Sequence, residues 1–308
     1  MTLGGRIKTR FTERLLADAV FQISPSHLSG LRVSRSDGAV KGGFVQPFPD
    51  SPVVPSFDRP NIVDAASLEA AIAQGQRNLH LSSGSVALLI PEPSVRVFVM
   101  SVDSFPASGK ERDTFIRWRI GKQMPLIPED ARIDYAVTPG KGLRKVIVAM
   151  ARQVVVWEYE ALFEKAGLKP VVVASPSLAL INLVPRDGQG TSVLLNIEDV
   201  TMTVLAMTGP GWSLYRQKDI GRPGGAADDR GETIVREAEN TIRFLEDRDE
   251  TRVEKLWLRC AVLDELDAVA AGLRERIRVP IAPLDYRAPE AWTDAHKALL
   301  APLIGQIL

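Results

Sequence analysis

Few residues in this sequence have the type and spacing to do chemistry, and one adjacent acid pair stands out. Glu198 and Asp199 lie between two apolar segments, where paired carboxylates can act as general acid and base. The same pattern is typical of a turn between two strands, and we favour the turn. The three histidines, His27, His80 and His296, are far apart and lack ligand spacing, so no metal site is predicted.

Three common motifs for phosphate binding or nucleophilic catalysis are absent. Gly109-Lys110 has Ser104 at the upstream glycine position of a P-loop and Glu111 where a hydroxyl would bind magnesium. The segment 83–85 is not followed by the glycine of a nucleophile elbow. The glycines of 38–43 fall in a predicted hairpin rather than at the strand-to-helix turn of a dinucleotide-binding fold. The motifs therefore reveal no recognisable catalytic site.

The composition excludes several other classes of protein. The 308 residues include 38 lysines plus arginines and 38 aspartates plus glutamates, so the formal net charge is zero. A broadly basic nucleic-acid-binding protein is therefore disfavoured. The apolar fraction of 45% and the charged fraction of 25% are ordinary for a globular protein. Cys260 is the only cysteine, which excludes an internal disulfide and fits a reducing, cytoplasmic compartment.

No segment is predicted to cross a membrane, because no apolar run reaches the roughly 20 residues that a spanning helix needs. The N-terminal segment 1–20 nevertheless has an apolar face and four basic residues, Arg6, Lys8, Arg10 and Arg14. Such a segment can lie on a membrane surface as an amphipathic helix. The alternative, which we favour because the apolar face is short, is a solvated helix packed against the fold.

Strands and helices alternate in both halves of the chain, which predicts an α/β fold with covered sheets. In the first half, strands are predicted at 20–23, 31–34, 86–90, 95–102, 132–137, 144–151 and 169–174, and helices from 64, at 110–123 and at 154–166. In the second half, strands are predicted at 192–197, 201–207, 212–217 and from 254, and helices at 233–245, 262–278 and 289–308.

An ordered series of segments resembles the type IV pilus assembly protein PilM family, whose members are actin-like relatives of the cell-division protein FtsA. The series includes Val86-Ala-Leu-Leu-Ile-Pro-Glu-Pro, Arg96-Val-Phe-Val-Met, Phe115-Ile-Arg-Trp-Arg, Glu129-Asp-Ala-Arg-Ile-Asp-Tyr, Tyr159-Glu-Ala-Leu-Phe and Pro176-Ser-Leu-Ala-Leu. The resemblance covers nearly the whole chain, and its strength lies in the order of the segments. It implies an actin-like (ribonuclease-H-like) two-lobed frame with a small α+β domain inserted in the first lobe.

The resemblance also implies domain boundaries. The first lobe would begin with 1–85, the inserted domain would span 86–175, and a helix and linker would occupy 176–190. The second lobe would span 191–288, and a C-terminal helix at 289–308 would pack back on the first lobe.

A working actin-like site holds ATP between two hairpins, and this sequence departs from the family pattern at both. The first hairpin, typically Asp-Ile-Gly-Ser-Ser-Ser followed by lysine, here has Ser24, Ser26 and, at the lysine position, Ser29. In the second, Asn196 and Glu198 replace the aspartate and glycine of Asp-Ile-Gly. Arg259 crowds the strand that usually ends in glycines at the adenosine. We therefore expect weak or no ATP binding, no cofactor and no enzyme activity, because a carboxylate repels phosphates.

The implied function is that of a cytoplasmic adaptor at the inner face of the membrane. It would bind the N-terminal cytoplasmic peptide of a PilN-like single-pass protein, and other pilus platform proteins, in a groove between the inserted domain and the first lobe. The predicted contacts are Arg117, Trp118, Arg119, Met124 and Pro125. For Trp118 taken alone we favour packing in the core of the inserted domain, but for the surface as a whole we favour partner binding.

Three alternatives remain open at this point. The first is an active actin-like ATPase that uses ATP with magnesium. The second is the cytoplasmic domain of a type II secretion platform protein, which the absence of a membrane span before Leu308 disfavours. The third is a peripheral membrane protein that binds through its basic N-terminus.

Overall fold

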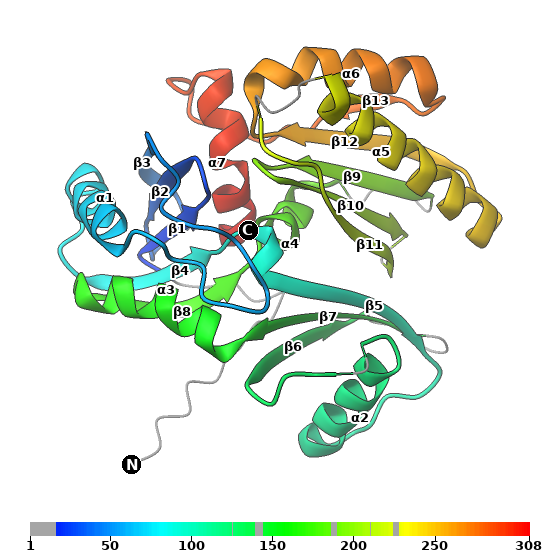
Figure 1. Ribbon diagram of the computed structural model, residues 1–308, viewed down its shortest axis with the longest axis horizontal. Coiled ribbons are helices and arrows are strands. Elements are labelled where there is room, and N and C mark those ends of the chain that lie inside the picture. The colour runs from blue at the N-terminus through cyan, green and yellow to red at the C-terminus, as the bar shows by residue number, and fades with distance from the viewer. Residues whose placement is uncertain (1–16, 125, 139–143, 186–189, 210, 224–227) are drawn as a thin grey trace.

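The computed structural model describes residues 17–124, 126–138, 144–185, 190–209, 211–223 and 228–308. Two five-stranded sheets and one three-stranded sheet form its frame (Figure 1). The basic N-terminal segment considered above lies almost wholly outside the described residues. None of the described helices combines the length and the apolar character that a membrane span requires.

The two five-stranded sheets have the same strand order. The first runs β3-β2-β1-β4-β8 and the second runs β11-β10-β9-β12-β13. In each, two antiparallel hairpins precede strands that pair in parallel. The first sheet consists of β1 (Ala19–Ile23), β2 (His27–Val33), β3 (Val40–Pro47), β4 (Gly84–Leu89) and β8 (Leu168–Ala174). The second consists of β9 (Thr191–Ile197), β10 (Thr201–Thr208), β11 (Gly211–Asp219), β12 (Val253–Cys260) and β13 (Ile281–Pro283).

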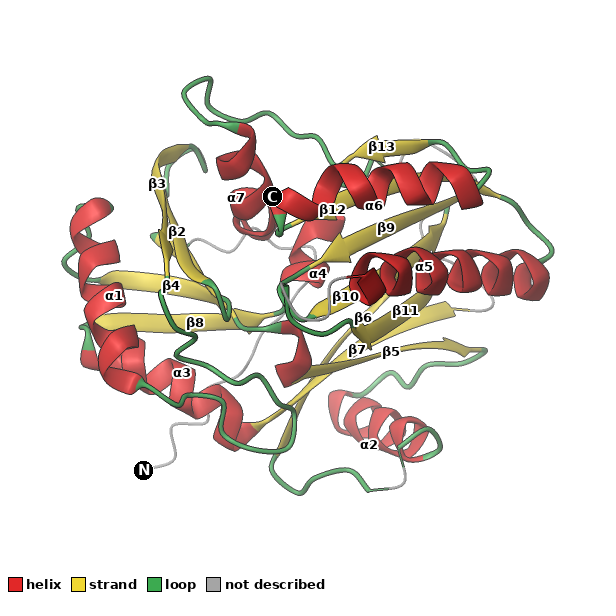
Figure 2. Ribbon diagram, turned by 45° about the horizontal axis from the view of Figure 1, so that its top comes forward, coloured by secondary structure: helices red, strands yellow, loops and turns green. Residues whose placement is uncertain are grey.

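Each sheet is covered by two helices on its outer face. The helices α1 (Ala65–Asn78) and α3 (Gln153–Lys165) cover the first sheet, and α5 (Asp228–Asp249) and α6 (Leu263–Arg276) cover the second (Figure 2). Alternation along the strands explains this layering, since Phe21 and Ile23 of β1 pack toward α1 and α3 while Val20 packs inward. Asp64 caps the N-terminus of α1, where its side chain accepts a hydrogen bond from the Ser67 amide at 3.0 Å.

The inserted domain is smaller than predicted. Its sheet, β5-β7-β6, consists of β5 (Val95–Val102), β6 (Ala131–Val137) and β7 (Arg144–Arg152), and α2 (Gly109–Gly121) packs on one face. The predicted span of 86–175 also includes β4, β8 and α3, which belong to the first lobe. The prediction was wrong there because strand patterns show where strands occur and not which sheet they join. A short 3-10 helix, η1 (Glu92–Ser94), connects β4 to the insertion.

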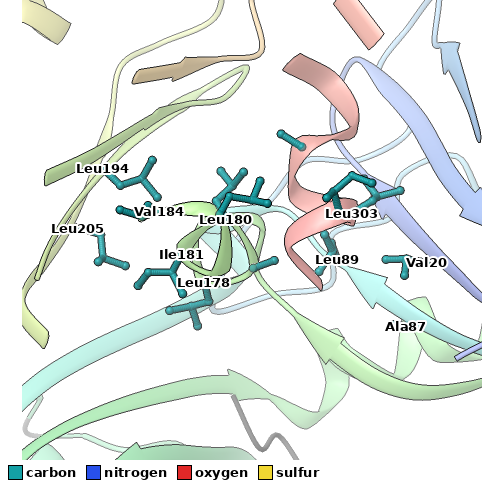
Figure 3. Close-up of a cluster of buried hydrophobic side chains, with 14 of the residues drawn as sticks. Val20, Ala87, Leu89, Leu178, Leu180, Ile181, Val184, Leu194, Leu205 and Leu303 are labelled. Atoms are coloured by element: carbon teal, nitrogen blue, oxygen red, sulfur yellow. The ribbon is translucent and has the colours of Figure 1, made fainter. Parts of the chain in front are cut away.

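Two short helical segments and one longer helix pack between the inner faces of the two five-stranded sheets. These are α4 (Pro176–Leu180) with η2 (Ile181–Leu183), and the C-terminal helix α7 (Asp294–Ile307). Figure 3 shows Leu178 and Leu180 beside Leu194 and Leu205 of the second sheet, with Leu303 of α7 on the first-lobe side. One continuous apolar cluster therefore joins the lobes, and α7 packs against β1 and β2 of the first.

Replacing Gly305 by alanine tests this helix crossing. A Cβ at Gly305 would overlap the backbone carbonyl of Ala179, which is fixed within α4. We expect Gly305→Ala to lower the free energy of unfolding by about 1–3 kcal/mol or more, measured by chemical denaturation. The control is Gly231→Ala in α5, where no atom lies near the added methyl and a gain of about 0.5–1 kcal/mol is expected. Equal effects at both glycines would contradict this packing.

Candidate functional site

The turns of two equivalent hairpins face each other between the lobes. The β1–β2 turn holds Ser24 and Ser26, and the β9–β10 turn holds Glu198 and Asp199. The Ser26 amide donates to Asp199 Oδ2 at 3.3 Å, which links the lobes directly. The acid pair therefore lies in a turn, as predicted. A cavity of about 250 Å³ lies here, lined by both turns and by the η1 and α4 prolines.

Arg259 reaches this site from β12 and is held there by three groups. Its side chain is 2% exposed, and Nη1 lies 2.5 Å from Glu198 Oε1, whose side chain is 9% exposed. Nη1 also donates to Asn196 Oδ1 at 2.9 Å, and Nε donates to the Ala298 carbonyl of α7 at 2.9 Å. Asn196 Nδ2 in turn donates to Ser177 Oγ at 2.9 Å. The chain's own guanidinium and carboxylate thus form a buried ion pair between the hairpin and α7.

Burial sets the protonation behaviour of this pair. Desolvation raises the pKa of the Glu198 carboxyl above its ordinary value, and the neighbouring Arg259 charge opposes that rise.

Arg230 holds the β9–β10 turn in place through the backbone of the turn. Its guanidinium donates to the carbonyls of Asp199 at 2.9 Å and Glu198 at 3.1 Å, and Nε pairs with Glu265 at 2.8 Å. These bonds fix the turn through its backbone. Consequently, the Glu198 side chain is held in a preformed position rather than on a mobile loop.

A second buried acid links the insertion side to the second lobe. Glu92 of η1 accepts a hydrogen bond from the Ser177 amide at 2.5 Å and from the Tyr215 hydroxyl of β11 at 2.7 Å. Desolvation raises the pKa of the Glu92 carboxyl, and these hydrogen bonds oppose the rise. Because Tyr215 comes from the second lobe, this contact also resists separation of the lobes.

The first turn contains a small hydroxyl–imidazole cluster. His27 Nδ1 lies 2.7 Å from Ser24 Oγ and 2.9 Å from Ser26 Oγ. Burial lowers the pKa of His27 to about 4, so the ring is neutral near pH 7. Ser29, at the predicted lysine position, is fully buried in β2, and its hydroxyl has no hydrogen-bond partner in the described part of the chain.

The structure therefore brings together Asn196, Glu198 and Arg259, as well as Ser24 and Ser26, but leaves Ser29 on its own. Sequence reasoning missed Glu92, Ser177, Tyr215 and Arg230, which support the cluster from other elements. Only the proline-bounded Pro91-Glu-Pro93 segment gave a local signal, since an acid between prolines at a strand end is unusual. In the described part of the chain, no three His, Cys, Asp or Glu side chains come together as a candidate metal site.

A separate apolar cavity lies between the inserted sheet and the first lobe. Its empty volume is about 480 Å³. The insertion contributes Val95, Arg132, Asp134, Ala149, Met150 and Ala151, and the first lobe and α4 contribute Ile90, Val156, Val173, Ala174, Ser175 and Leu178. Arg132, which lines the groove, is ion-paired with Glu160 of α3 at 3.0 Å. β6 and β8 are edge strands of their sheets, so both present unpaired backbone groups near this cavity.

The predicted partner contacts are not in this groove. Ile116 and Ile120 of α2 pack on Met100, Val146 and Val148 of the inserted sheet, whereas the groove lies on the opposite face. Figure 1 shows α2 at the outer edge of the molecule. Arg117, Trp118, Arg119 and Met124 therefore belong to α2 and its C-terminal end, and Pro125 lies outside the described residues. Trp118 is 54% exposed, so it does not form the core of the insertion.

Comparisons with known proteins support the architecture. Neither the protein-family models nor the curated protein sequences match this chain. A structure described as "PilM-PilN type IV pilus biogenesis complex" is similar over 96% of this chain and 97% of that one, with a TM-score of 0.76 and 18% identity.

Two more distant structures are also similar along nearly the whole chain. A Bacteroides thetaiotaomicron protein with actin-like ATPase fold is 11% identical over 94% of this chain and 98% of its own, with a TM-score of 0.54. The cytoplasmic domain of EpsL, an inner-membrane component of the Vibrio cholerae type II secretion system, is 11% identical over 94% and 93%, with a TM-score of 0.50.

The chain has the actin-like fold, with a small α+β insertion in the first lobe, as predicted. Its greatest likeness among these three is to the PilM-PilN structure.

Proposed function

We propose that this protein is a non-catalytic cytoplasmic adaptor of a type IV pilus assembly complex. It binds the N-terminal cytoplasmic tail of a PilN-like single-pass membrane protein and thereby resides at the inner face of the cytoplasmic membrane. The observation that carries the proposal is the full-length likeness to the PilM-PilN structure at a TM-score of 0.76. Association with other pilus platform proteins is part of the same proposal.

The apolar groove between the insertion and the first lobe supports this role. Its mostly aliphatic lining suits an apolar side chain of an extended peptide. The neighbouring edge strands β6 and β8 offer backbone hydrogen-bonding groups, which an extended peptide can use by strand addition. The Arg132–Glu160 pair at the groove adds polar groups that can orient the tail.

The non-catalytic part of the proposal rests on the interlobe site. The Arg259–Glu198 pair takes up the space between the hairpins, and the remaining cavity of about 250 Å³ is small for a nucleotide. Lobes that are already linked through Ser26–Asp199 and Glu92–Tyr215 do not need a nucleotide to hold them together. The active ATPase and the type II secretion component remain the alternatives.

A direct test is fluorescence anisotropy of a labelled synthetic tail, with the sequence of the partner's cytoplasmic N-terminus, titrated with the full chain. We expect saturable binding, with a scrambled peptide of the same composition as control. Equal binding of the native and scrambled tails, or no binding of either, would refute the adaptor role.

A further inference from the structure

The helix α2 and the residue after it carry more positive than negative charge. Five cationic side chains lie on or next to this helix, against Glu111 and Asp113: Lys110, Arg112, Arg117, Arg119 and Lys122. Among the described residues, none of these five cations is ion-paired; the ion pairs found all involve other basic side chains. In a chain of zero net charge, this helix is a local cationic surface.

The arginines of α2 are anchored without being neutralised. Arg112 donates to the Pro106 carbonyl at 2.7 Å, Arg117 to the Ala131 carbonyl at 3.0 Å and Arg119 to the Ser101 carbonyl at 2.6 Å. Carbonyl oxygens hold the guanidinium groups in place but leave their full charge. The positive charge is therefore fixed on the surface.

Two large apolar side chains are exposed on α2 or shortly after it. Trp118 is 54% exposed, and Leu126, shortly after the helix, is 82% exposed. The Lys122 ammonium lies 3.9 Å from the centre of the Trp118 ring, so an aromatic and a cation form one unit. By comparison, the exposed Phe244 of α5 lies beside Arg248, which is ion-paired with Asp249 at 2.6 Å.

We propose that α2 and Leu126 form a contact site for an anionic membrane surface. Lipid headgroups supply the negative charge that the five cations lack, and tryptophan and leucine enter the boundary between headgroups and acyl chains. The helix lies at the outer edge of the molecule (Figure 2). None of its residues lines the groove, and this position suits a broad, planar surface better than an extended peptide. The contact is independent of the tail-binding role, because the two surfaces lie on opposite faces of the inserted sheet.

The test is co-sedimentation of the full chain with vesicles of phosphatidylcholine alone or mixed with anionic phosphatidylglycerol. We expect binding to the mixed vesicles only, and a decrease at high salt. The double variant Lys110→Glu/Lys122→Glu should lower the partition coefficient about tenfold or more, and Trp118→Ala should also lower it. The matched control is Trp157→Ala, since Trp157 of α3 is 59% exposed but outside the α2 surface.

Several results would overturn the membrane contact. One is equal sedimentation with neutral and mixed vesicles. Another is a loss of vesicle binding only when Arg6, Lys8, Arg10 and Arg14 are replaced by glutamine, while the α2 variants bind vesicles like the unmodified chain. The N-terminus would then be responsible for the binding. A third is binding of a polyglutamate peptide to α2 in a chain that does not bind vesicles, which would identify an acidic protein as the partner. If the unmodified chain binds mixed vesicles but does not bind the partner tail, only the adaptor role is contradicted.

Discussion

Replacing Arg259 by methionine is expected to lower the free energy of unfolding by about 3–5 kcal/mol, measured by denaturant titration. The Arg259 side chain is 2% exposed, and its loss leaves the Glu198 carboxylate buried without its cation. Asn196 would also lose a hydrogen-bond donor at 2.9 Å. Arg276→Met is the control, because Arg276 is 40% exposed and its ion pairs at the surface contribute little.

The pH dependence of this loss has a defined sign. Without Arg259, the charge that opposes the rise in the Glu198 pKa is gone, so the pKa of the folded state moves further above its unfolded value. A raised folded-state pKa contributes stability below the unfolded pKa, and that stability is lost as pH rises. The stability gap between wild type and Arg259→Met should therefore widen with increasing pH.

A double variant separates the contribution of the ion pair to stability from the cost of leaving one charge buried without a partner. Glu198→Leu/Arg259→Met replaces both charges by apolar groups and should be less destabilised than Arg259→Met alone. If both variants lose the same stability, the ion pair is not the interaction that Arg259 supplies.

Filling the groove is expected to abolish capture of the partner tail. Ala151 of β7 and Ala174 of β8 line opposite sides of the cavity and are only partly buried. Ala151→Trp or Ala174→Trp should weaken tail binding at least about thirtyfold, measured by fluorescence anisotropy, because the ring occupies the space for the peptide's apolar side chains. A thermal melt of each variant distinguishes a filled groove from a failure to fold.

Trp118→Ala is the matched control for the groove variants. Since α2 lies on the other face of the inserted sheet, this change should leave tail affinity within about twofold of wild type. Loss of tail binding in Trp118→Ala, with binding retained in the groove variants, would move the partner site to α2.

The overall architecture was predictable from the sequence, whereas the location of individual sites was not. Alternation and apolar runs located strands such as β4, β7 and β9, because strand periodicity is a local property. The order of the segments that resemble the PilM family predicted the actin-like frame. Neither signal shows which sheet a strand joins, so β8 was assigned to the insertion although it pairs with β4.

The same limit applies to the predicted partner residues. Trp118 and its basic neighbours were predicted to contact the partner, and this stays a prediction; Trp118 is 54% exposed and so lies outside the core of the insertion. Only the packing of Ile116 and Ile120 shows which face of the inserted sheet α2 covers. The interlobe cluster was partly predictable, because Asn196, Glu198 and Arg259 replace residues of the family pattern. Glu92 and Tyr215 join it through contacts more than a hundred residues apart, which no local pattern encodes.

Calorimetric titration of magnesium–ATP into the full chain tests most directly whether the interlobe site has been converted from nucleotide binding to a fixed structural contact. We expect no heat of binding at several temperatures, and none with magnesium–ADP, because the Arg259–Glu198 pair occupies the site and Glu198 repels phosphate. A dissociation constant in the low micromolar range would contradict the account, and a nucleotide-dependent adaptor or an ATPase would replace it.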